Sequence, residues 1–215
     1  MMLIQEQSRF VDKGMHLQLF ARTVFGVCPS CAGPVLITQD PPLVLPYRPE
    51  NARATCLRCS FQRSDSKGEW FGPVNGIVKS RCRNCGFKWL KKTLRFEAQK
   101  SESARSALVT CPSCGLVEDI AMRFSIARFG SAIDPAFGLP LWMQVPCCGH
   151  VLWAFNKDHL AKLRQYITAE LRERIGVMHW SMFSRLPAWM TSAKNRDAVL
   201  KGIGRLEEKL ESINS

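Results

Sequence analysis

The sequence lacks any long apolar run, and its most apolar stretch, Val177 to Met190, is interrupted by polar and charged residues. A membrane-spanning helix needs about 20 consecutive apolar residues, so we expect no membrane association. The N-terminal Met1 to Ile4 is followed by polar residues rather than by a long apolar core. We therefore expect no secretory signal and a cytoplasmic, reducing environment.

Motifs that mark common catalytic centres are also missing. We find no Ser–His–Asp order, no glycine-rich phosphate loop and no His-Glu-x-x-His helix. We therefore predict that the protein is not an enzyme. The alternative is a metal-dependent hydrolase, with an open metal position at Cys147-Cys148-Gly149-His150 and Glu118 or Asp119 as an assisting carboxylate.

Cysteine, by contrast, is abundant, and the ten cysteines come in closely spaced pairs. Four pairs have the form Cys-x-x-Cys, and a fifth is compressed into Cys-Cys-Gly-His. The candidate ligands are Cys28, Cys31, Cys56, Cys59, Cys82, Cys85, Cys111, Cys114, Cys147, Cys148 and His150. Repeated cysteine pairs in a chain without a secretory signal indicate bound metal rather than disulfides.

Each Cys-x-x-Cys pair, or knuckle, places two sulfurs on one side of a tight turn and so supplies half of a tetrahedral zinc site. A glycine after the second cysteine, as at Gly86 and Gly115, permits the positive φ that such a turn needs. We predict at least two structural Zn²⁺ ions. An iron–sulfur cluster and a thiol–disulfide pair are the alternatives, although neither Cys31 nor Cys114 opens a helix that would activate a thiol.

The sequence leaves the pairing of the knuckles open. Sequential pairing joins Cys28/Cys31 to Cys56/Cys59 and Cys82/Cys85 to Cys111/Cys114, and it leaves Cys147, Cys148 and His150 over. The other pairing joins Cys111/Cys114 to Cys147 or Cys148, with His150 as a further ligand, and requires Cys28/Cys31 to reach Cys82/Cys85. A third site needs an outside ligand, for which His16, His159 and His179 are candidates.

Short strands are predicted between the knuckles. Val35–Thr38 is rich in β-branched residues. Ile77–Arg81 and Phe87–Phe96 flank one knuckle as hairpin arms, and Leu108–Thr110 and Met122–Phe129 flank another in the same way.

The C-terminal third is predicted to be helical, with Asn156 as the cap of a helix that runs from Lys157 to about Gly176. A second helix is expected over Asn195–Leu210, and the apolar stripes of both favour core packing. The fold class is thus α+β, with tandem β zinc ribbons followed by helices. We divide the chain into an N-terminal segment (1–26), ribbon 1 (27–76), ribbon 2 with the Cys-Cys-Gly-His extension (77–155) and a helical region (156–215).

The knuckles Cys111-Pro-Ser-Cys114-Gly115 and Cys82-Arg-Asn-Cys85-Gly86 resemble those of the zinc-ribbon class found in transcription, replication and translation proteins. The resemblance covers residues 28–150 loosely. The stretches Asp134–Asn156 and Ser184–Arg196 are also similar to bacterial proteins that carry several zinc ribbons and have no assigned role. These resemblances imply an architecture and no activity.

The whole chain has a formal net charge of +12, and the positive charge is concentrated in one part of it. Residues 79–105 hold nine basic and two acidic side chains, and a clustered positive field attracts polyanions. If 87–96 is a strand, Phe87, Trp89, Lys91, Thr93 and Arg95 share one face, and lysines alternate with Leu90, Leu94 and Phe96 on the other. The candidate nucleic-acid contacts are Arg81, Arg83, Lys88, Trp89, Lys91, Lys92 and Arg95.

We therefore predict a structural-zinc protein that binds DNA or RNA without catalysis. A second hypothesis is a protein–protein adaptor built on zinc ribbons. In either case the C-terminal helices are candidates for docking a protein partner or a second copy of the chain. The basic side chains have a simpler interpretation as a solvated cover that protects an exposed strand.

Overall fold

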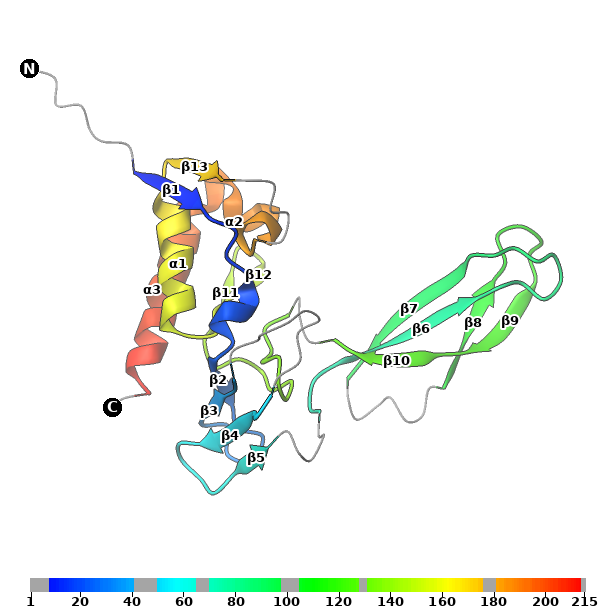
Figure 1. Cartoon of the computed structure of the whole chain (residues 1–215), viewed down its shortest axis with the longest axis horizontal. Coiled ribbons are helices and arrows are strands. Elements are labelled where there is room, and N and C mark those ends of the chain that lie inside the picture. The colour runs from blue at the N-terminus through cyan, green and yellow to red at the C-terminus, as the bar shows by residue number, and fades with distance from the viewer. Residues whose placement is uncertain are drawn as a thin grey trace, which may run out of the picture.

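The computed structural model describes residues 8–40, 50–64, 70–97, 105–127, 131–175 and 181–213. It is an α+β protein with several small sheets and helices near its C-terminus, as the sequence predicts. Buried residues fall into two separate clusters. The larger cluster forms the core of what we call the main body, the described residues of 8–64 and 131–213. The smaller one lies in the arm, the described residues of 70–127, which projects from the main body (Figure 1).

The largest sheet of the main body is a four-stranded antiparallel sheet, with its strands in sequence order. The strands are β2 (Thr23–Val27), β3 (Pro34–Thr38), β4 (Arg53–Cys56) and β5 (Gln62–Ser64). Val24, Val35 and Ile37 are fully buried and supply much of this sheet's share of the core. The strand predicted at Val35–Thr38 is therefore confirmed as part of β3.

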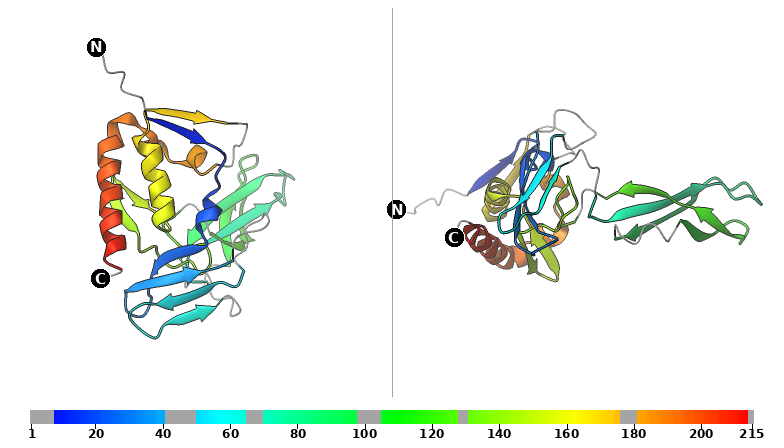
Figure 2. Two further views of the ribbon diagram at one scale, coloured as in Figure 1. Left: turned by 60° about the vertical axis from the view of Figure 1, so that its left-hand side comes forward. Right: turned by 90° about the horizontal axis from the view of Figure 1, so that it is seen from below.

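The helices α1 (Lys157–Thr168) and α3 (Arg196–Glu211) lie side by side (Figure 2), and both contribute residues to this core. The main body also contains the hairpin of β11 (Gln144–Cys147) and β12 (His150–Trp153) and the short helix α2 (Ala188–Thr191). Asn156 caps α1 as predicted, because its Oδ1 accepts the backbone N–H of His159 at 2.9 Å. Val199, Ile203 and Leu206 of α3 are fully buried. The apolar stripe of α3 thus packs in the core, as predicted.

The first helix ends earlier than predicted, at Thr168 rather than near Gly176, which lies outside the described residues. The chain then forms β13 (Leu171–Arg174), which pairs in parallel with β1 (Arg9–Asp12). The guanidinium of Arg172 also donates to the carbonyl oxygens of Tyr166 and Ile167, which have no helical partner at this end of α1. Pairing with a strand remote in sequence thus overrides the helical periodicity.

The arm consists of two small sheets that share the second core. One has the strand order β10–β6–β7, with β6 (Val74–Ser80) in the centre between β7 (Leu90–Phe96) and β10 (Arg123–Ile126). The other is the hairpin of β8 (Ser106–Thr110) and β9 (Val117–Ala121). The core between them consists of Val78, Cys82, Leu90, Ala107, Val109, Cys111 and Met122.

One predicted hairpin in the arm is wrong. The partner of β8 is β9, and the predicted partner segment Met122–Phe129 instead contributes β10, which pairs with β6. The cause is the tight turn at Cys111–Cys114, after which the chain reverses and pairs at once from Val117. The other predicted hairpin, on either side of Cys82–Cys85, is confirmed by the antiparallel pairing of β6 with β7.

The two cores do not follow the boundary that was predicted at residue 155. Phe137, Leu141, Met143, Leu152 and Phe155 all belong to the main-body core, together with the helices, rather than to the second ribbon. Within the described residues, none of the helices is long and apolar enough to cross a membrane.

Candidate metal centres and a basic sheet face

The first cysteine tetrad lies at one end of the four-stranded sheet. Cys28 and Cys31 lie in the turn between β2 and β3, whereas Cys56 ends β4 and Cys59 lies in the turn before β5. The Sγ atoms of Cys28 and Cys59 are 3.7 Å apart, and those of Cys31 and Cys56 are 3.5 Å apart. Because β2 to β5 pair in order and antiparallel, the β2–β3 and β4–β5 turns lie at the same end of the sheet, and both knuckles meet there.

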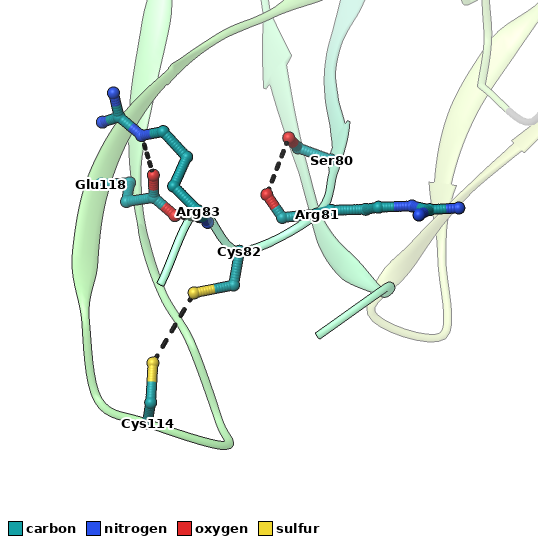
Figure 3. A network of polar contacts seen from close by, with 6 residues as sticks. All are labelled: Ser80, Arg81, Cys82, Arg83, Cys114 and Glu118. Atoms are coloured by element: carbon teal, nitrogen blue, oxygen red, sulfur yellow. Dashed lines mark hydrogen bonds and ion pairs between the residues drawn. The ribbon is translucent and has the colours of Figure 1, made fainter. Parts of the chain in front are cut away.

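The second tetrad joins the two hairpins of the arm. Cys82 and Cys85 lie between β6 and β7, and Cys111 and Cys114 lie between β8 and β9. The Sγ atoms of Cys82 and Cys114 are 3.6 Å apart (Figure 3), as are those of Cys85 and Cys111. Sequential pairing is therefore the arrangement that the structure adopts, and the crossed alternative is wrong.

Both tetrads fit a tetrahedral metal ion. In each, the four sulfurs lie within 4.8 Å of one another. A tetrahedron with metal–sulfur distances of about 2.3 Å has edges of about 3.8 Å, close to the separations observed, whereas a disulfide requires about 2.05 Å. Each tetrad could thus hold one metal ion.

Three of the four knuckles, those that begin at Cys28, Cys82 and Cys111, share one backbone turn. Gly86 N–H donates to the Cys82 carbonyl at 3.0 Å, and Gly115 N–H donates to the Cys111 carbonyl at 2.9 Å. Gly86 and Gly115 have φ of +73° and +75°, as predicted for the position after the second cysteine. In the first knuckle Ala32 takes the same place with φ 55°, a left-handed conformation that is less favourable for a residue with a Cβ.

The thiols of the first tetrad have widely separated acidities. Burial raises the pKa of Cys56, but backbone N–H groups of Arg58 and Cys59 that face its sulfur outweigh burial and lower the pKa to about 6. The N–H of Phe61 lowers the pKa of Cys59, yet burial and the three neighbouring sulfurs raise it to about 12.

The second tetrad repeats this separation. The backbone N–H of Leu116 outweighs burial and lowers the pKa of Cys114 to about 6. The N–H of Cys85 lowers the pKa of Cys82, but burial and the sulfurs of Cys114 and Cys111 raise it to about 11. One thiol in each tetrad is therefore ready to ionise near neutral pH, while another gives up its proton only to a cation that binds several sulfurs together.

A buried carboxylate supports the knuckle at Cys82–Cys85. The Glu118 side chain on β9 is 3% exposed, and it accepts the backbone N–H of Arg83 at 3.3 Å and the Arg83 Nε–H as well (Figure 3). The hydrogen bond from the Arg83 side chain lowers the pKa of Glu118, so the carboxylate stays ionised. Glu118 therefore joins β9 to the neighbouring knuckle, a contact that was not predicted from the sequence.

The predicted ligands Cys147, Cys148 and His150 are arranged differently from the knuckles. Cys148 and Gly149 both have positive φ, of 51° and 74°, and form the two-residue turn of the β11–β12 hairpin. Cys147 is buried beneath α3, with Sγ 3.5 Å from the Ala198 carbonyl oxygen, and the His150 ring stacks on Trp189 at 5.0 Å. Among the described residues, only the two tetrads bring three or more potential ligands together, so a third site stays a prediction.

The three-stranded sheet of the arm has one face turned away from the arm core, which we call the outer sheet face. Residues directly opposite one another in an antiparallel pair share a face, so the strand register defines its members. They are Asn75, Ile77 and Lys79 of β6, Lys91, Thr93 and Arg95 of β7, Arg123 and Ser125 of β10, and Trp89 directly before β7. None of these three strands contains an acidic residue.

Three residues of the predicted basic patch make contacts within the protein. Arg83 pairs with Glu118, Lys92 donates to the Leu108 carbonyl at 2.8 Å, and Arg95 donates to Ser131 Oγ at 3.0 Å. These three cations connect parts of the protein to one another. The Arg81 side chain extends away from Cys82 and Cys114 in Figure 3.

Trp89 and Lys91 lie together on the outer sheet face, where the Lys91 ammonium is 5.0 Å from the centroid of the Trp89 ring. Arg81 and Lys88 are exposed near the knuckle. Lys79 and Arg123 join the face from β6 and β10. Neither residue was predicted as a contact. For Arg123 the reason is that the pairing of β10 with β6 was not predicted.

None of the known protein families, curated proteins and solved structures with which we compared the chain matches it. The two cysteine tetrads and the outer sheet face are therefore the features from which a function can be inferred.

Proposed function

We propose that the chain is a structural-zinc protein of zinc-ribbon type that binds nucleic acid, without catalysis, through the outer sheet face. Four cysteine ligands at tetrahedral spacing suit zinc, although iron also accepts such a set. The arm supports the structural role, because its core has seven buried residues and two of them are cysteines of the second tetrad. A metal ion would replace the apolar contacts that so small a core lacks.

The observation that carries the nucleic-acid proposal is the pairing of Lys79 with Lys91. They are directly opposite each other on adjacent strands. Like charges in this position destabilise a sheet, and none of the ion pairs recorded among the described residues involves either lysine. A polyanion would relieve this repulsion, because phosphates would be placed between and above the two ammonium groups.

Cations near the second tetrad have a competing role. Four thiolates bound to one divalent cation retain negative charge, which Arg81 and Lys88 are placed to balance from the knuckle that carries Cys82 and Cys85. Lys79, Lys91 and Arg123 belong to the strands rather than to this turn. They are therefore the better residues for a test of phosphate binding.

The test is a titration of zinc-loaded protein against fluorescein-labelled oligonucleotides, followed by anisotropy over a range of salt concentrations. We expect affinity to fall steeply with salt, and the variant Lys79→Gln/Lys91→Gln to bind more weakly, with a log–log salt slope reduced by about 2. The matched control is Lys157→Gln/Lys201→Gln, which removes two exposed lysines from α1 and α3. Binding that is independent of salt, or equal effects of the two double variants, would refute the proposal.

A protein partner is the second candidate function, and it is favoured by exposed apolar residues on the β8–β9 hairpin. Leu108 is 62% exposed and Val117 is 55% exposed. A pull-down in the presence of nuclease should recover such a partner, and the Leu108→Ser/Val117→Ser variant should lose it. Loss of the partner on nuclease treatment would favour the nucleic-acid proposal instead.

A further inference from the structure

Trp89 is placed unlike the other described tryptophans. Trp89 is 61% exposed, whereas Trp70 is partly buried, and Trp142, Trp153 and Trp189 are partly buried and pack against the core of the main body. Burial of an aromatic ring is its main contribution to stability, and Trp89 gains little from folding. The ring lies instead at the edge of a cationic face, with the Lys91 ammonium over it.

The outer sheet face combines apolar surface with cations on both sides. Ile77, which is 36% exposed, is opposite Arg123 of β10 on one side and opposite Thr93 of β7 on the other. Lys79 and Lys91 come two positions further along the same face, toward the knuckle. Lys79 and Lys91 therefore lie between Ile77 and Trp89 along the face. Because neighbouring strands lie about 4.8 Å apart, these apolar, cationic and aromatic side chains are within reach of a single extended ligand.

We infer that the outer sheet face binds single-stranded rather than duplex nucleic acid, with Trp89 stacking on a base while Lys79, Lys91 and Arg123 contact phosphates. This inference rests on the proposed function and names the substrate of that same face. Bases of a single strand are free to stack on an aromatic side chain while the backbone follows a row of cations. In a duplex the base faces are already stacked on one another, so Trp89 would gain nothing.

The shape of the arm also argues against a duplex. A two-stranded ribbon fits the major groove, which is about 12 Å wide. Here the sheet has three strands, which span about 10 Å between the axes of the outer two before side chains are counted. The inner face is in addition covered by β8 and β9 across the arm core. The arm is therefore too thick to enter the groove, and a duplex would meet only the phosphate-binding side chains.

The test compares single-stranded DNA, single-stranded RNA and duplex DNA of one length and sequence, by anisotropy at one salt concentration, with the full zinc-loaded chain. We expect both single strands to bind at least about tenfold more tightly than the duplex. Trp89→Ala should weaken binding of single strands by about 5- to 150-fold, the range found for loss of one stacked base, and should leave binding of the duplex unchanged. Trp89→Phe retains an aromatic ring and should restore most of the affinity.

The outcomes separate this inference from the proposed function. Equal affinity for single strands and duplex, or equal binding by Trp89→Ala and the unaltered protein, would overturn single-strand recognition and leave a phosphate-binding face in place. The absence of salt-dependent binding to any of the three probes would overturn both. Metal content and circular dichroism of the two Trp89 variants should match those of the unaltered protein, because the side chain is exposed.

Discussion

His159 should make the protein less stable as the pH falls below neutral. The side chain is on the first turn of α1, 3% exposed, with its ring stacked on Phe20 at a centroid distance of 5.1 Å. Its Nδ1 accepts the backbone N–H of Phe155 at 3.2 Å, so the neutral ring carries its proton on Nε2. Burial disfavours the charged imidazolium and lowers the pKa of His159 to about 3.

The size of the effect follows from proton linkage. An unfolded histidine has a pKa of about 6.5, so between pH 6.5 and 3 the unfolded chain binds a proton that the folded protein does not. Stability from His159 is thus complete above about pH 6.5 and is lost as the pH falls. Between pH 7.5 and 5.5 the folded state takes up almost no proton at this site. The expected loss is therefore about 1.4 kcal/mol, the free energy of one pKa unit.

Urea unfolding of the metal-loaded protein at pH 7.5 and 5.5 measures this loss, with His159→Asn as the matched variant. Asn keeps an acceptor near Nδ1 and cannot titrate, and its two cysteine tetrads are unchanged. Any release of metal at acid pH is then common to both proteins, and the difference between their losses isolates His159. Equal losses of stability in the two proteins would show that the imidazole is not held neutral, and would refute the reasoning.

Three further predictions follow from the tetrads and from helix α3. Zinc titration at pH 7 should saturate at two equivalents, one for each tetrad. Zinc binding should also release protons, because Cys59 has a pKa of about 12 and must lose its proton to bind. Calorimetry in two buffers with different ionisation enthalpies measures the number of protons released. The variant Cys85→Ser should lose one equivalent of metal and the amide-exchange protection of the arm, while α1 and α3 stay protected. The control variant Cys148→Ser should keep both metal ions. Loss of protection throughout the chain in Cys85→Ser would contradict the two separate cores. Gly204 has open space around it, so Gly204→Ala should raise the free energy of unfolding by about 1 kcal/mol. Gly202→Ala should lower the free energy of unfolding by about 1–2 kcal/mol, because the new Cβ would meet Leu152 Cδ2 at 2.8 Å. Chemical denaturation that shows equal gains for the two variants would refute this close approach.

Residues close together in the sequence made part of this structure predictable. The knuckle turn depends on local spacing and on glycine at positions such as Gly86, and both are visible in the sequence. The cap at Asn156 and the helix that begins at Lys157 are equally local. The alternation along 87–96 also predicted that Leu90 and Lys91 lie on opposite faces, and the structure buries Leu90 and exposes Lys91.

Contacts between distant segments account for the errors and the omissions. The β1–β13 pair ends α1 at Thr168, and β10 pairs with β6 rather than with β8, as no local pattern indicates. Glu118 and Arg83 are 35 residues apart and meet only because β9 packs beside the knuckle. The outer sheet face likewise exists only once three strands are aligned.

The sequence by itself therefore determined the chemistry of the ligands: which cysteines form knuckles, where the helices start, and where positive charge is dense. These follow from residue type and near-neighbour spacing, which act over one or two turns of the chain. Only the tertiary structure decided which knuckles meet, that Cys147 lies under α3, and that Lys79 and Arg123 share a sheet face with Trp89. Those relations depend on strand pairing and core packing between segments far apart in the chain, and register and burial are set by such contacts rather than by local propensity.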